Sequence, residues 1–77
     1  MQTENSIHWE LTTKTQKGKQ NTSKCLTFGQ AINSGSRAFD HGDSNIRVFR
    51  CEPQPDGSVK KVLVAEQKEG TREITIL

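Results

Sequence analysis

Four residues of the kinds that bind zinc are scattered along the chain: His8, Cys25, His41 and Cys51. Two imidazoles and two thiolates would complete a tetrahedral zinc site, but such sites take their ligands as close pairs from short loops. Each of these four residues stands ten or more positions from the next. We therefore predict no metal site and no cofactor. The cysteines are expected to be reduced and buried, with one disulfide between them left open as the alternative.

A second group that could take part in a reaction is the segment from Asp40 to Asp43, in which His41 stands beside an acid. A carboxylate next to a histidine can orient and charge the ring for general-base work. The same residues are also typical of a loop that ends a helix. The segment belongs to no recognisable nucleophile motif, and the chain has no glycine-rich phosphate loop and no serine elbow. We expect no catalytic residues and no enzymatic activity.

The strongest candidate for binding is residues 14–24, which carry Lys14, Lys17, Lys19 and Lys24 with no acid and no apolar side chain. Four positive charges among Gln, Asn, Thr and Ser can follow a phosphate backbone or an acidic protein surface. A solvated loop kept soluble by lysine is the alternative. Long loops in small domains are usually functional, so we predict a mobile basic loop that contacts a partner.

A second set of candidate binding residues is Arg47, Phe49, Arg50, Lys60 and Lys61. Arg47 and Phe49 lie two positions apart, so in a strand they share one face. Sheet proteins that read RNA combine charge and an aromatic ring in this way. Glu52, Glu66 and Glu73 would equally neutralise these cations by cross-strand pairing.

Composition indicates one small domain with a thin core. The chain has 77 residues, 30% of them hydrophobic and 26% charged, and a mean hydropathy of -0.78. Its net charge of +2 comes from residues 1–24, which hold four lysines against two glutamates. So small a domain buries only about 60% of its unfolded surface, which favours a partner or a dimer.

The beginning of the sequence is polar and lacks a basic cluster followed by an apolar run. No window is apolar enough to cross a bilayer. We expect a cytoplasmic protein with no membrane association, in which residues 1–5 are disordered and residues 1–77 form a single domain.

The element that organises these residues is a helix predicted over residues 28–39. Thr27 and Gln30 form a capping box, and Leu26 and Ala31 take the two positions of a hydrophobic staple. The apolar residues that follow fall on one side of the helix, interrupted by Gly35. Four polar or small residues in the middle of the segment leave open an end one turn earlier.

Alternating apolar residues predict strands over residues 6–13, 45–51 and 72–77, and a nearly continuous apolar run predicts another over 59–66. Turns are predicted at 52–57 and 68–70. The order is therefore β-α-β-β-β, and the last three strands form a meander. We predict an α+β fold in which one helix packs on a small, mainly antiparallel sheet. The other face of that sheet is left to solvent or to a partner, and the orientations of Trp9 and Phe49 decide how apolar it is.

The predicted order is a strand, a loop, a helix with the sequence Leu-Thr-x-x-Gln-Ala, a strand with the sequence Ile-Arg-Val-Phe-Arg, and a hairpin. This order resembles small phage and mobile-element proteins, among them some anti-CRISPR inhibitors of type I systems. The likeness covers about residues 25–67. It implies a non-catalytic protein that binds a bacterial nucleoprotein complex and blocks access of nucleic acid through basic residues. The net basic charge departs from inhibitors that mimic DNA with acidic surfaces.

The resulting expectation is a small phage-like binding protein that inhibits or modulates a host protein or nucleoprotein complex through the two basic sets. Direct nucleic-acid binding through Arg47, Phe49, Arg50, Lys60 and Lys61 is one alternative. A homodimer formed along an exposed edge of the strand predicted over residues 6–13 or of the strand over 72–77 is another.

Overall fold

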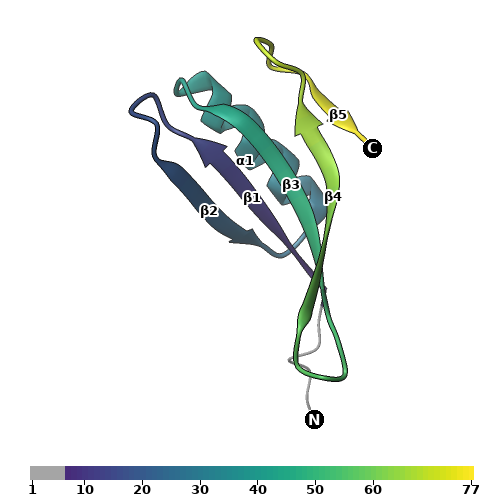
Figure 1. The fold of residues 1–77 in the computed structure, drawn as a ribbon. Helices are drawn as coiled ribbons and strands as arrows, with labels where there is room; N and C mark the ends of the chain where they lie inside the picture. Colours follow the sequence, from purple (N-terminus) through teal and green to yellow (C-terminus); the bar gives the residue numbers. More distant parts are fainter. Residues whose placement is uncertain (1–6) are drawn as a thin grey trace.

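The sheet and the helix that covers it are built from residues 7–77, the part of the chain that the computed structural model describes. The elements are β1 (His8–Lys14), β2 (Gln20–Cys25), α1 (Phe28–Asp40), β3 (Ser44–Pro53), β4 (Val59–Gln67) and β5 (Ile74–Ile76). All neighbouring strands are antiparallel, in the order β2-β1-β3-β4-β5. Helix α1 crosses one face of this sheet (Figure 1). The expected disorder of residues 1–5 lies outside the described residues.

The predicted α+β class, one helix on an antiparallel sheet, is confirmed, and the β-α-β-β-β succession is present with one additional strand. The prediction of a mobile loop over residues 14–24 is wrong in its second half, which forms β2 and pairs with β1. Only the turn remains, closed by a hydrogen bond of 2.8 Å from the Thr15 amide to the Lys19 carbonyl. Five of the six residues of β2 are exposed, so the strand has no apolar alternation by which to recognise it.

Helix α1 begins as the capping box predicts, with one difference. The Thr27 hydroxyl accepts a hydrogen bond from the Gln30 amide, while the Gln30 side chain accepts one from the amide of Leu26 rather than that of Thr27. The predicted staple between Leu26 and Ala31 is wrong, because Leu26 is 71% exposed. The helix does not end early: it continues to Asp40.

The core lies between α1 and one face of the sheet, with members from β1, β2, β3 and β4. Its buried members are Leu11, Cys25, Ala31, Ile46, Val48 and Ala65, with Trp9 among the side chains packed against them. Gly35 faces this core, and a Cβ atom placed on it would lie 3.0 Å from Ile46 Cγ2. The helix can approach the sheet this closely because that position has no side chain.

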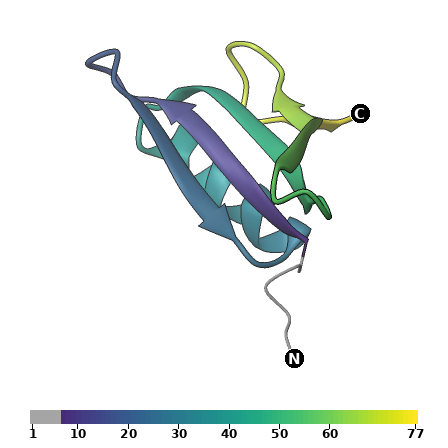
Figure 2. The ribbon, with the colours of Figure 1, turned by 60° about the horizontal axis from the view of Figure 1, so that its bottom comes forward.

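The second face of the sheet has no helix over it in the described part of the chain, as the rotated view in Figure 2 shows. The β3–β4 hairpin also projects past the end of α1 (Figure 1). Within residues 7–77 the outer edges of β2 and β5 have no partner strand. The prediction that β1 offers a free edge for a second copy is wrong, because β1 lies between β2 and β3, whereas pairing of two copies along β5 stays a prediction. No helix of the described residues is both long and apolar enough to cross a membrane.

Candidate functional site

The face of the sheet that α1 leaves uncovered, here called the open face, gathers most of the candidate residues. Cross-strand pairing arranges its side chains in four rows. The rows are Gln20 and Lys14; Thr22, Thr12, Arg47 and Glu66; Lys24, Glu10, Phe49 and Leu63; and His8, Cys51 and Lys61. Trp9 takes the opposite parity and packs on the core, so Phe49 is the aromatic ring of this face.

The first two rows form a basic end. Lys14, Gln20, Arg47 and Phe49 line a shallow hollow of ≈ 140 Å³ together with Asn45. Within residues 7–77, neither Lys14 nor Arg47 has a carboxylate oxygen within 4.0 Å, although Glu66 is the register partner of Arg47. Two cations without a carboxylate partner among residues 7–77 and two side-chain amides therefore line the same hollow as an aromatic ring.

Three further lysines extend the positive charge. Lys17 and Lys19 belong to the turn that joins β1 to β2, next to the row that holds Lys14. Lys24 lies at the other end of β2, across from Glu10. All three are exposed, and none is within 4.0 Å of a carboxylate oxygen of the described residues. The four lysines predicted as one loop thus lie along an ordered β-hairpin that borders the open face.

The predicted set on β3 and β4 is divided between the two sides of the sheet. Arg47, Phe49 and Lys61 are on the open face, but Arg50 and Lys60 point to the opposite face of the sheet. Arg50 is held in an ion pair of 2.7 Å with Glu52, its neighbour on that side. Consecutive strand residues alternate in direction, so Lys60 and Lys61 cannot share a surface.

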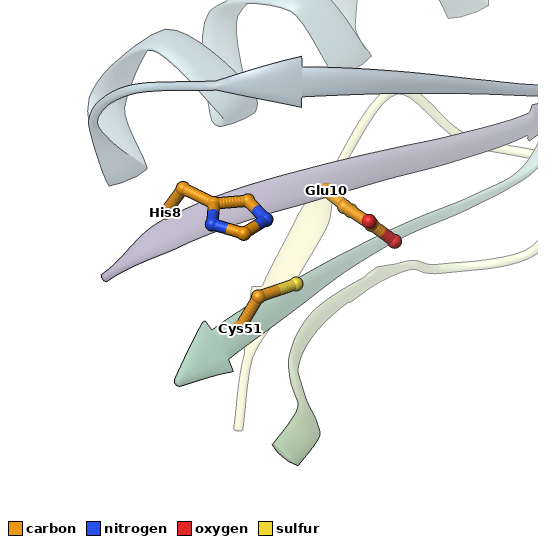
Figure 3. A group of neighbouring side chains, drawn as sticks. All are labelled: His8, Glu10 and Cys51. Atoms are coloured by element: carbon orange, nitrogen blue, oxygen red, sulfur yellow. The ribbon is translucent and has the colours of Figure 1, made fainter. Parts of the chain in front are cut away.

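The other end of the open face carries a cluster of His8, Glu10 and Cys51. One nitrogen of His8, a carboxylate oxygen of Glu10 and Cys51 Sγ all lie within 4.8 Å of one another. Figure 3 shows the His8 and Glu10 side chains extending from β1 and the Cys51 side chain from the adjacent β3. His8 and Glu10 are half-buried, whereas Cys51 is fully buried.

Lys61 borders this cluster and makes an ion pair with Glu10, with 2.9 Å between Lys61 Nζ and Glu10 Oε1. The hydrogen bond and the charge of Glu10 raise the pKa of Lys61. Burial raises the pKa of the Cys51 thiol, and the negative charge of Glu10 adds to that effect while Lys61 opposes it. The cluster therefore joins a neutral thiol, an imidazole and a charged pair in one place.

The four residues of zinc-binding types, His8, Cys25, His41 and Cys51, do not all lie together in the structure. Cys25 belongs to the core under α1, and His41 caps the C-terminal end of α1. Both cysteines are free and buried, as the preferred interpretation of the sequence expected. The sequence did contain one signal for the observed cluster, because His8 and Glu10 stand two positions apart on the polar side of a predicted strand.

The chain matches no protein-family profile, no curated protein and no solved structure. The resemblance to small phage proteins therefore stays a prediction. What can be inferred about function comes from the chemistry of the open face.

Proposed function

We propose that this protein is a non-catalytic nucleic-acid-binding module that holds a single strand against the open face. The observation that carries the proposal is the hollow at the basic end, where the unpaired cations Lys14 and Arg47 lie beside Phe49. Proteins that bind single strands combine a cationic path for phosphates with aromatic rings on which bases stack. Here the phosphates would contact Lys14, Arg47 and Lys24, and one base would stack on Phe49.

The size of the open face supports a short site. From Gln20 to Lys24 the strand β2 spans about 14 Å, given a rise of about 3.4 Å per residue. That length corresponds to about two nucleotides of an extended strand, with the turn lysines Lys17 and Lys19 available to the phosphates beyond. A site with one ring and few phosphate contacts would be weak and strongly dependent on salt.

Measurement of fluorescence anisotropy with a labelled single-stranded oligonucleotide of about 12 nucleotides tests this proposal. The variant Lys14→Glu/Arg47→Glu should lose at least about tenfold in affinity, because two cations become anions at the hollow. The matched control is Lys60→Glu/Lys68→Glu, which changes the net charge equally but alters exposed residues that are not on the open face. The control should lose less than about threefold.

Salt dependence provides a second test. If about three phosphates are neutralised, log K should fall with log salt with a slope near −2 between about 50 and 200 mM. Equal losses in the two double variants would contradict the proposal, because they would show that only net charge matters. Absence of binding at low salt would also contradict it.

The function expected first from the sequence, binding to a host protein or nucleoprotein complex, would use the same cations on an acidic protein surface. Capture of partners from a bacterial lysate with and without nuclease separates the two. A stoichiometric protein complex that survives nuclease and is lost in the Lys14→Glu/Arg47→Glu variant would favour the protein partner and overturn the proposal. Loss of all partners after nuclease would agree with nucleic acid as the ligand.

A further inference from the structure

We propose that His8, Glu10 and Cys51 form a binding site for one divalent transition-metal ion, with Zn²⁺ the best fit. The donor atoms of these side chains all lie within 4.8 Å of one another. Tetrahedral zinc with bonds of about 2.0 to 2.3 Å needs its donors about 3.3 to 3.7 Å apart. No pair of donors therefore has to close by more than about 1.5 Å.

The three donors lie at one end of two neighbouring strands, with His8 the first residue of β1 and Cys51 near the end of β3. His8 and Cys51 are direct register partners of the antiparallel pair β1 and β3, and Glu10 follows His8 on the same face. From Trp9 onward β1 is paired on both sides, with β2 and β3, while His8 is paired with β3. Donors placed on rigid strands lose little freedom when they bind a metal, so the site is partly preorganised.

The types of ligand select the class of metal. A thiolate and an imidazole favour zinc or cobalt over magnesium and calcium, which prefer oxygen ligands alone. Three protein ligands leave a fourth position for water in a tetrahedral site. Water can reach this position because His8 and Glu10 are only half-buried.

Metal binding requires two local changes at the cluster. The Cys51 thiol must release its proton to solvent, so affinity should rise with pH. Lys61 must give up its ion pair with Glu10, which it can do because its side chain is 53% exposed. An ion pair that is this open to water contributes little to stability and is easily replaced.

Binding would also change the charge of the open face. Before binding, the negative Glu10 and the positive Lys61 cancel, and Cys51 is neutral. A divalent ion with one thiolate adds one net positive charge, and Lys61 becomes free. This site does not depend on the proposed nucleic-acid binding, since it involves neither Lys14 nor Arg47. If both hold, the metal should strengthen binding of a single strand.

Titration of the reduced protein with Co²⁺ tests the site, because cobalt occupies zinc sites and its thiolate complexes absorb light. One equivalent should produce a thiolate-to-cobalt charge-transfer band that Zn²⁺ removes. The chain supplies matched controls, since only one of its two cysteines and one of its two histidines belong to the cluster. Cys51→Ser and His8→Gln should weaken binding at least about tenfold, and Cys25→Ser and His41→Gln less than about threefold.

A measurement on the unaltered protein keeps the test independent of variant folding. On addition of Zn²⁺, the ring resonances of His8 should shift in the NMR spectrum while those of His41 stay in place. Absence of the charge-transfer band would overturn the proposal, as would equal loss in the Cys25 and Cys51 variants or a shift of His41 alone.

Discussion

The amino group of Lys61 on β4 lies 2.9 Å from the carboxylate of Glu10 on β1, so the two side chains meet across the intervening strand β3. Cys51 is the register partner of Lys61 on β3 and is fully buried although it belongs to the face that the helix leaves uncovered. This ion pair neutralises the end of the open face opposite to the hollow at Lys14 and Arg47. The uncompensated positive charge is therefore concentrated at the other end.

Replacing Glu10 by Gln should strengthen the binding of single-stranded nucleic acid severalfold. The change releases Lys61 and removes the negative charge from the row that contains Phe49. If Lys61 then contacts a phosphate, the salt slope should steepen by about 0.7. Glu69→Gln is the control, because it makes the same change of net charge in the exposed β4–β5 turn. Equal gains in affinity for the two variants in an anisotropy titration would refute a specific effect.

Replacing Phe49 by Ala should weaken single-strand binding by about 1 to 3 kcal/mol, the usual contribution of one stacked base. Phe49→Trp should keep the affinity, because it retains a flat ring at the same position. Circular dichroism would establish that both variants are folded. A Phe49→Ala variant that binds as tightly as the unaltered chain would show that the face contacts phosphates only.

Replacing Gly35 by Ala should lower the free energy of unfolding by about 1 kcal/mol, despite the better helix propensity of alanine. The added Cβ would meet Ile46 Cγ2 at 3.0 Å and Ile74 Cδ1 at 3.1 Å, and Ile46 is fully buried. Gly29 on the same helix has no atom within 4 Å of such a Cβ, so Gly29→Ala should be neutral or stabilising. Urea denaturation of both variants compares the two positions directly. A Gly35→Ala protein more stable than the unaltered chain would contradict the close approach of α1 to the sheet.

The stability of the fold should decline in alkaline solution, partly through Cys25. Burial raises the pKa of this thiol, which is only 4% exposed. Below about pH 8.5, the ordinary pKa of a thiol, the folded and unfolded chains both keep the proton and stability is complete. Above that pH the unfolded chain ionises first, so the free energy of unfolding falls until the folded thiol also ionises.

The comparison for this prediction is Cys25→Ala, whose free energy of unfolding should fall less steeply between about pH 8.5 and 10. Denaturation curves at a series of pH values measure that slope in both proteins. An unchanged slope in the variant would mean that ionisation of Cys25 is not coupled to unfolding.

Local rules of sequence were sufficient for most of the secondary structure. The capping residues Thr27 and Gln30 begin the helix at Phe28, and the segment 52–57 produces the turn after β3. Alternation of apolar residues located β1 and β3, and a nearly continuous apolar run located β4, each to within two residues at either end. These signals are short-range, because each depends on residues a few positions apart.

The missed strand β2 shows where such rules fail. Its residues Gln20 to Lys24 are polar and exposed, so the strand exists through backbone pairing with β1 rather than through burial. A strand stabilised in this way needs no alternation of apolar residues, so the sequence carries no periodic pattern that reveals it.

The candidate sites were decided by the tertiary structure. Arg50 and Lys60 lie on the opposite face of the sheet from Arg47 and Lys61, because successive residues of a strand alternate between the faces. A shift in the β3–β4 register next to Val48 decides which residues of β4 lie opposite those of β3. The closeness of His8 to Cys51 depends on β1 lying next to β3 in the sheet. The sequence alone determined which side chains each strand offers to one face. Which strands become neighbours is decided by burial of the common core under α1, since that burial joins segments far apart in the chain.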